Sequence, residues 1–232
     1  MRDYIILNGV NSNELTGLLI TSLPPISKPL MRTQIETIDG RDGDIITKLG
    51  YSAYDKQVEI GLYGDYDIDE IIAFFASEGT VTFSNEADKY YDYQILDQID
   101  YNKLIRYKTA TVKLHVQPYK HDFMGTMDVT VFPIWVTNIG NTIAKPILTI
   151  YATGDITLSL NGDQIFSISM GDYEYIVIDT NNMEAYMGGV LLNRQVTGDY
   201  SSFALQVGEN TITFGGTGAV TEVLIENYSR WI

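Results

Sequence analysis

The stretch Tyr119-Lys120-His121-Asp122-Phe123-Met124-Gly125-Thr126-Met127 separates two parts of the sequence that differ in composition. Before it, charged residues are dense and the strongest helix pattern of the chain occurs. After it, charge becomes sparse, Gly and Asn become frequent, and short strand-like segments follow one another to the C-terminus. We therefore predict two domains, residues 1–122 and residues 123–232, joined at this stretch.

Length and composition fit a folded, soluble protein. A chain of 232 residues can form one large β domain or two ordinary ones, and either can bury a core. Its 45% hydrophobic and 19% charged residues exclude wholesale disorder. The absence of cysteine excludes disulfides, thiolate zinc sites and Cys nucleophiles, and it fits assembly in a reducing cytoplasm.

The net charge of −15 is shared between both parts. Up to Asp122 there are 12 Lys+Arg against 19 Asp+Glu, or −7, and afterwards 3 against 11, or −8. Without a basic cluster the chain cannot neutralise DNA phosphates, so sequence-specific nucleic-acid binding is excluded. No stretch approaches the roughly 20 apolar residues of a membrane span, and the N-terminal run Tyr4–Leu7 is too short for a secretory signal.

The first part combines strand patterns with one helix. Alternation predicts strands at residues 33–38 and 56–63, with Val58, Ile60 and Leu62 on one face of the second. Between them, Asp39-Gly40-Arg41-Asp42-Gly43 suits a tight turn with positive φ, and Gly50 indicates a further break.

The helix is predicted over residues 68–78. Asp67 is its expected N-cap, Ile68, Ile71, Ile72 and Phe75 form an apolar stripe, and Gly79 is its expected C-terminal stop. Residues 97–106 are interpreted as a strand or a connector.

The second part is predicted to be nearly all β. Residues 129–137 form an apolar segment that contains Pro133, and Asn161-Gly162 between two apolar runs is the strongest hairpin signal of the chain. About nine short strands with regular turns favour an antiparallel sandwich. The predicted fold class is thus mainly β: an N-terminal α+β domain, sandwich- or barrel-like with one helix, followed by an antiparallel β-sandwich.

The sequence Asp65-x-Asp67-x-Asp69 resembles the start of a calcium loop. Such a loop needs Gly at its sixth position and a bidentate Glu at its twelfth, where this chain has Glu70 and Ala76. A helix cap is therefore the better interpretation, and no metal site is predicted.

No catalytic constellation is apparent either. His115, expected on a strand, and His121, expected in the linker, have neither metal-ligand spacing nor a matching Ser. Trp135 and Trp231 stand in apolar, strand-like surroundings that favour core packing over a sugar platform. Arg41-Asp42 is interpreted equally well as a binding element or a solvated turn. We predict no catalytic, cofactor-binding or metal-binding residues and no enzymatic activity.

Several motifs in order resemble the siphophage distal tail proteins (Dit). In the first part they are Asn8-Gly9-Val10, Ile38-Asp39-Gly40-Arg41-Asp42-Gly43, the helix, and Val116-Gln117-Pro118-Tyr119. In the second part they are Asn138-x-Gly140-Asn141, Ala144-Lys145-Pro146-Ile147, Thr153-Gly154-Asp155-Ile156, Ile178-Asp179 and Gly208-Glu209-Asn210-Thr211-Ile212. Asp39 departs from the family, which usually has Pro there. The second part resembles the family's galectin-like sandwich but lacks its His-x-Asn-Pro-Arg sugar-contact pattern.

The resemblance implies a structural role in a virion. Members form a homo-hexameric ring at the distal end of a long non-contractile tail, assembled in the host cytoplasm. The ring joins the tail tube protein to the baseplate or to a tail-associated lysin, tail fibre or receptor-binding protein, and it leaves a channel for DNA. The N-terminal domains form the ring. We expect residues 22–48 to reach a neighbouring subunit.

Two other classes of function remain open. One is a carbohydrate-binding module or adhesin that recognises host cell-wall glycans through residues 123–232. The other is a glycan-active enzyme, although no acid/base pair stands out.

Overall fold

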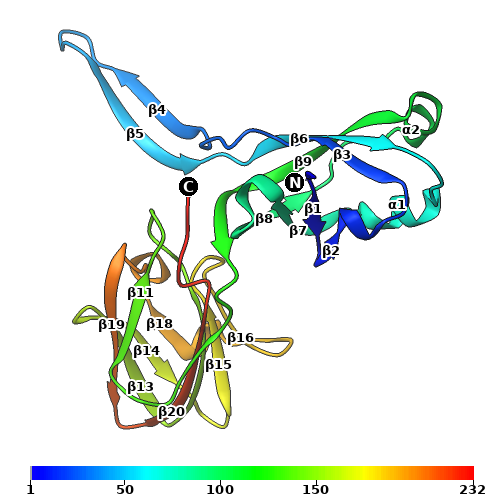
Figure 1. The fold of residues 1–232 in the computed structure, drawn as a ribbon. Helices are drawn as coiled ribbons and strands as arrows, with labels where there is room; N and C mark the ends of the chain where they lie inside the picture. Colours follow the sequence, from blue (N-terminus) through cyan, green and yellow to red (C-terminus); the bar gives the residue numbers. More distant parts are fainter. Residues whose placement is uncertain (1) are drawn as a thin grey trace. The chain divides into compact units, whose positions relative to one another are not determined.

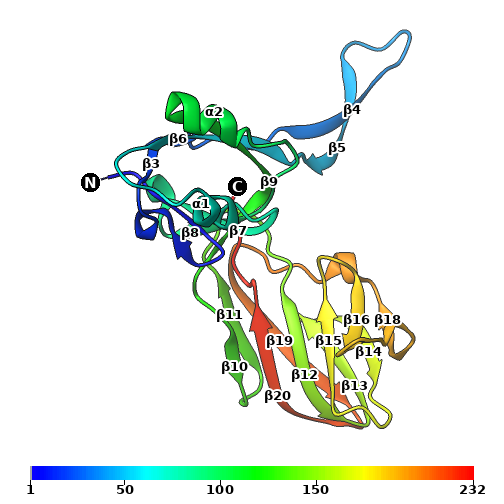
Figure 2. The same ribbon diagram turned by 90° about the vertical axis from the view of Figure 1, so that its right-hand side faces the viewer.

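The computed structural model describes residues 2–232, and antiparallel strands dominate it (Figures 1 and 2), which confirms the mainly β prediction. The chain divides into two compact units. The first extends to Phe123, and the second comprises Met124–Trp231. No helix among the described residues is both long and apolar enough to cross a membrane.

The first unit is built on a seven-stranded sheet in the order β2-β1-β7-β8-β9-β6-β3, and a separate hairpin pairs β4 with β5. The strands and helices are β1 (Ile5–Leu7), β2 (Val10–Asn11), η1 (Ser12–Glu14), β3 (Leu18–Ser22), β4 (Met31–Thr37), β5 (Asp44–Tyr51), β6 (Tyr54–Leu62), α1 (Ile68–Phe74), β7 (Glu78–Phe83), η2 (Ser84–Glu86), β8 (Lys89–Gln94), α2 (Tyr101–Tyr107) and β9 (Thr109–Asp122).

Alternation of side chains places the core of this unit on one face of the sheet. Val58, Ile60 and Leu62 of β6 are buried, as predicted, and Val112 and Leu114 of β9 lie beside them. Such alternation follows from the period of two along a strand. Helix α1 adds Ile71 to the same core.

The Asp67 cap of α1 is confirmed. Its Oδ1 atom accepts hydrogen bonds from the backbone N–H groups of Asp69 and Glu70, at 2.9 and 3.2 Å. We expect Asp67→Ala to lower the free energy of unfolding by about 1 kcal/mol, the usual effect of losing an N-cap. Urea unfolding measures the change, and Asp65→Ala, which removes the same charge outside the helix, should change stability by less than half as much. Equal effects of the two substitutions would contradict the cap.

The predicted end of this helix is wrong. Helix α1 stops at Phe74 because both Phe74 and Phe75 pack into the core, and Phe75 takes a non-helical ψ of 66°. Gly79 belongs to β7 and does not terminate the helix. Its φ is +143°, and a Cβ there would lie 1.8 Å from the Asn8 side chain, so the position requires glycine.

A second helix, α2, lies where a strand or connector was expected, which also corrects the prediction of a single helix. Asp100 caps it by accepting from the Lys103 N–H at 2.9 Å. Leu104 is fully buried, and Lys108 ends the helix in the left-handed region with φ of 59°.

The stretch that separates the two parts of the sequence is partly strand. Strand β9 continues to Asp122, and its last residues pair with β8. His121 therefore lies on a strand opposite Tyr90, and its expected place in a linker is wrong.

The second unit consists of two antiparallel sheets that share one core (Figure 2). A six-stranded sheet has the order β10-β20-β12-β15-β16-β17, and a five-stranded sheet has the order β11-β19-β13-β14-β18. The elements are β10 (Met127–Val129), β11 (Ile134–Asn138), β12 (Ile147–Thr153), β13 (Asp155–Leu160), β14 (Asp163–Ser169), β15 (Tyr175–Asp179), β16 (Glu184–Met187), β17 (Val190–Leu191), η3 (Asn193–Gln195), β18 (Val196–Gly198), η4 (Tyr200–Ser202), β19 (Gly208–Gly216) and β20 (Ala219–Glu226).

The hairpin at Asn161-Gly162 is confirmed, since both residues have positive φ (53° and 95°) between β13 and β14. The second unit has eleven strands where about nine were predicted. The apolar segment 129–137 is interrupted between Val129 and Ile134, which separates β10 from β11, and β18 was not predicted. Trp135 is not a core residue. It is 68% exposed because it alternates with the buried Ile134 and Val136. Trp231 is half-buried.

Candidate interaction surface

The hairpin of β4 and β5, which we call the arm, is the most distinctive surface of the first unit. It forms its own two-stranded sheet and extends away from the seven-stranded sheet (Figure 1). Arg41 and Asp42 lie in its terminal turn, where Gly40 and Gly43 have positive φ as predicted (81° and 78°). Gly50 does not break the chain. It lies within β5 with φ of 96°, next to a shift in the β4–β5 register.

The arm carries apolar side chains that its own unit does not cover. Ile35 and Ile46 are directly opposite each other across the two strands, and each is 60% exposed. Leu49 and Ile38 are also exposed on the arm. Isolated exposed aliphatic residues are ordinary on a protein surface, whereas a cross-strand pair on a projecting hairpin makes the arm the candidate interaction surface.

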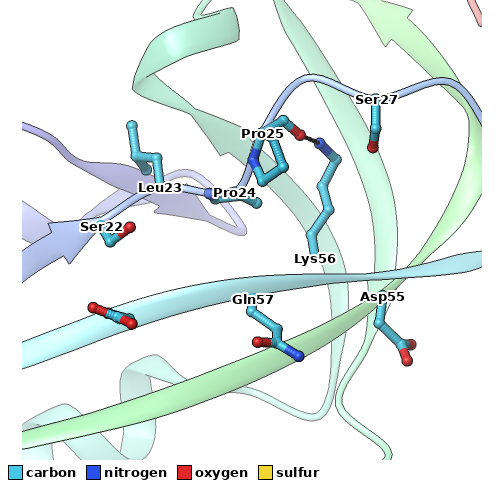
Figure 3. A pocket seen from close by; sticks show the side chains of 9 residues that line it. Ser22, Leu23, Pro24, Pro25, Ser27, Asp55, Lys56 and Gln57 are labelled. Carbon is cyan, nitrogen blue, oxygen red and sulfur yellow. Dashed lines mark hydrogen bonds between the residues drawn. The ribbon is translucent and has the colours of Figure 1, made fainter.

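The root of the arm, residues 22–30, is held to the body of the unit through its backbone carbonyl groups. Lys56 Nζ donates to the carbonyl oxygen of Pro25 at 3.1 Å (Figure 3). Asn85 Nδ2 donates to that of Pro24 at 3.0 Å, and the Tyr54 hydroxyl donates to that of Ser27 at 3.4 Å. The two prolines restrict the backbone through their fixed φ, and the three hydrogen bonds hold the carbonyl groups in place. Together they set the direction in which the chain leaves β3.

A hollow of about 310 Å³ lies between this root and β6. The side chains of Asp55 and Gln57 extend from β6 beside it, while Lys56 points toward Pro25 (Figure 3). We assign no ligand to this hollow, because its most buried polar group, Lys56, is already bonded to the arm root.

Lys56 belongs to a buried charge cluster with Glu86 and Lys120. Glu86 Oε1 accepts from Lys120 Nζ at 2.6 Å and Oε2 accepts from the Tyr91 hydroxyl at 2.6 Å, while Lys56 Nζ lies 3.9 Å from Oε2. Lys56 is only 2% exposed and Glu86 9%. The Lys56 ammonium also lies 4.9 Å from the centre of the Tyr91 ring and 5.3 Å from that of Phe83. The cluster has two ammonium groups and one carboxylate, and these aromatic faces partly stabilise the positive charge that Glu86 does not balance.

The pKa shifts follow from this arrangement. Burial alone would raise the pKa of the Glu86 carboxyl, but the hydrogen bonds from Lys120 and Tyr91 and the charges of both lysines outweigh it, so the pKa is lowered. Burial lowers the pKa of Lys56, and the charge of Glu86 partly opposes that shift. Burial and the hydrogen bond to Glu86 raise the pKa of Tyr91.

Acidification should weaken the first unit through Glu86. The pKa of Glu86 in the folded state is below its value of about 4.3 in the unfolded state. The carboxylate therefore contributes fully to the free energy of unfolding above about pH 4.3, and this contribution is lost as the pH falls through the folded-state pKa. We expect the free energy of unfolding to fall as the pH is lowered below about 4, and to fall less steeply in the Glu86→Gln variant. Urea unfolding of both proteins between about pH 2 and pH 7 measures the difference. Identical pH dependence in both would contradict the assignment.

The residues that the sequence offered as candidate catalytic or metal-binding groups do not come together in the structure. His115 lies on the outer face of β9, where its Nδ1 is 2.7 Å from Asp55 Oδ1, and Asp55 also pairs with Lys113 at 3.0 Å. Asp67 serves as the helix cap. Residues 2–232 contain no group of three or more His, Cys, Asp or Glu side chains arranged to hold a metal ion.

Comparison with known proteins rests on structure, since no protein-family model and no curated protein matches the sequence. The Dit protein of phage SPP1 superimposes with a TM-score of 0.67 and 15% identity, and the alignment covers 100% of both chains. The chain has the fold of a phage Dit protein. A chain of the phage p2 baseplate in its activated conformation with Ca matches with a TM-score of 0.52 and 11% identity, covering 100% of this chain and 98% of the other. The same baseplate with Sr gives 0.51 and 10%, covering 97% of each. The Dit fold therefore extends over both units.

Proposed function

We propose that this chain is a structural component of a phage tail and forms a homo-hexameric ring at the distal tip of a long non-contractile tail. The observation that carries the proposal is the match to the SPP1 Dit protein over the full length of both chains. That protein is described as a paradigm of the hub adsorption apparatus in phages that infect Gram-positive bacteria. The first unit would form the ring, and the second would be a galectin-like sandwich.

In this role the chain joins the tail tube protein to the baseplate, a tail-associated lysin, or a fibre or receptor-binding protein. It is assembled in the host cytoplasm and resides in the virion. The role requires shape complementarity and no bond-making step, so we assign it no enzymatic activity.

The arm supplies what a ring needs. A cyclic hexamer is held by heterologous contacts, in which one surface of a subunit meets a different surface of the next. Ile35 and Ile46 face away from their own unit, and the anchored root fixes where they point. We propose that residues 22–48 contact the neighbouring subunit.

The acidity of the chain fits a channel for DNA. A net charge of −15 per subunit gives a ring a negative potential that repels phosphates, so a genome passes without binding to the wall. A cryo-EM structure of the assembled ring tests this. A lumen lined with Lys and Arg would contradict it.

Three measurements test the proposed function. Native mass spectrometry of the purified protein should show a species of six chains, and negative-stain images should show six-fold rings with a central opening. Antibodies against the protein, applied to virions, should label the tail end opposite the capsid. Labelling of the capsid, or along the whole tail, would overturn the proposal even if hexamers form in solution.

A further inference from the structure

The outer face of the five-stranded sheet in the second unit carries a row of hydroxyl groups. Inward positions such as Ile156, Leu158 and Ile168 are buried, so the residues between them point outward. By register, Thr197 of β18 is opposite Ser167 of β14, and Ser167 is opposite Thr157 of β13. Adjacent strands are about 4.8 Å apart, so three hydroxyl-bearing residues cross the sheet at even spacing. We call Thr157, Ser167 and Thr197 the hydroxyl row.

The hydroxyl row borders a hollow of about 510 Å³. This volume lies within the range of about 300–1,000 Å³ that small-molecule sites occupy. Thr157 is opposite Gly215 on the next strand, and Gly215 and Gly216 contribute no side chain to that end of the sheet, which leaves the hollow open. Arg194 and Gln195 of η3 line its other end.

Hydrogen bonds within the face orient two of its hydroxyl groups. Gln164 Nε2 donates to Ser167 Oγ at 3.1 Å, so the Ser167 proton remains available to donate to another group. Ser169 Oγ donates to Asp155 Oδ1 at 2.7 Å, so the oxygen of Ser169 keeps lone pairs that accept. The hollow thus presents both donors and acceptors, on the hydroxyl row and on the neighbouring cross-strand pair of Asp155 and Ser169.

The charge distribution indicates which ligand fits. The unit has a net charge of −8, with 3 Lys+Arg against 11 Asp+Glu, yet the hydroxyl row itself is uncharged. A polyanion would be repelled by the unit as a whole. A neutral saccharide has hydroxyl groups that donate and accept at the same time, which matches the hydroxyl row, the carboxylate of Asp155 and the guanidinium of Arg194.

We propose that this hollow binds a neutral, hydroxyl-rich saccharide through Thr157, Ser167 and Thr197, with Asp155 and Arg194 at its margins. The inference goes beyond the structural role proposed above and does not depend on it. In a tail-tip protein it would add a weak glycan contact of its own, repeated in every copy.

Binding of defined neutral oligosaccharides to the full-length protein tests the proposal. The probes are cellohexaose, chitohexaose and a galactan hexamer, with a glycerol-phosphate hexamer as the anionic comparison, measured by isothermal titration calorimetry. We expect at least one neutral probe to bind and the anionic one not to bind. Binding of the anionic probe alone, or of no neutral probe, would overturn the proposal.

Variants place the binding in the hollow. Ser167→Tyr should fill it and abolish measurable binding, and Thr157→Val, which keeps the shape of the side chain, should weaken binding about two- to tenfold, the effect of one lost neutral hydrogen bond. The matched control is Thr213→Val on β19, which faces the same side opposite Ser159 but does not line the hollow. Unchanged binding by Ser167→Tyr, or equal losses in the two valine variants, would contradict the site. Native mass spectra of the same samples report separately on hexamer formation.

Discussion

The double substitution Ile35→Asp/Ile46→Asp is expected to abolish hexamer formation while both units stay folded. The two side chains are exposed in the single chain, so their loss removes little from its own stability. Fully burying an exposed isoleucine contributes about 1.5–3 kcal/mol, and each of these two side chains has 60% of its surface left to bury, so each contact loses about 2–4 kcal/mol. That corresponds to a contact weakened at least about twentyfold, and the buried carboxylates weaken it further. A ring contains this contact six times if the proposed stoichiometry holds, so the effect on assembly is cumulative.

Native mass spectrometry and size-exclusion chromatography measure this outcome, and circular dichroism verifies that the variant is folded. The matched control is Val131→Asp/Val207→Asp, which introduces the same two charges at apolar side chains that are 75% and 56% exposed in the second unit. The control should assemble like the unmodified protein. A double variant that still elutes as a hexamer would show that the arm does not make the ring contact.

Glu86→Gln should produce the largest loss of stability of any single substitution in the charge cluster. The carboxylate is the counter-ion of two buried ammonium groups, Lys56 and Lys120, and the amide leaves both without a negative partner. Breaking a buried ion pair by removing one partner costs about 3–5 kcal/mol. The amide keeps the shape of the side chain but has only one acceptor oxygen, so it can accept from the Tyr91 hydroxyl or from Lys120 and not from both, and one hydrogen bond is lost together with the charge.

Urea unfolding at pH 7, followed by hydrogen–deuterium exchange in peptides from β6, β8 and β9, measures the loss in the first unit. Asp55→Asn is the control, because Asp55 also has two side-chain partners, the Lys113 ammonium at 3.0 Å and His115 Nδ1 at 2.7 Å, but on the surface. Its effect should stay below about 1 kcal/mol. If Glu86→Gln changed stability by no more than the control, the cluster would not contribute as proposed. A variant that remains folded but no longer assembles would instead point to the link between Lys56 and the arm root.

The fold class and several local features follow from the sequence because they depend on neighbouring residues. The Asp67 cap and the Asn161-Gly162 turn involve groups within a few positions of each other, and their chemistry is visible in the order of residues. Helix α2 was missed because it buries a single leucine and so has almost no periodic signal, whereas α1, of the same length, begins an apolar stripe at Ile68, Ile71 and Ile72. The exposure of Trp135 was predictable. It alternates with Ile134 and Val136, and the period of two assigns it to the opposite face.

The interaction surface could be predicted only in part. The segment 22–48 stood out because of its prolines and its double-glycine turn. The charge cluster did not, because positions 56, 86 and 120 lie on three elements that only the folded sheet brings together. One signal was present: Lys56 has the same parity along β6 as Val58 and Ile60, so alternation already places a lysine on the buried face. The hydroxyl row likewise depends on strand order, which composition does not reveal.

Strand β9 has a mechanical consequence. The polypeptide leaves the first unit for the second at the C-terminal end of β9, so tension that this connection transmits along the strand acts on that end of β9. The strand is flanked by β6 along its first half and by β8 along its second half, and antiparallel hydrogen bonds run perpendicular to the strands. A pull in this direction loads many bonds in shear at the same moment and does not unzip them one after another. The first unit should therefore withstand stretching forces better than its thermodynamic stability alone suggests.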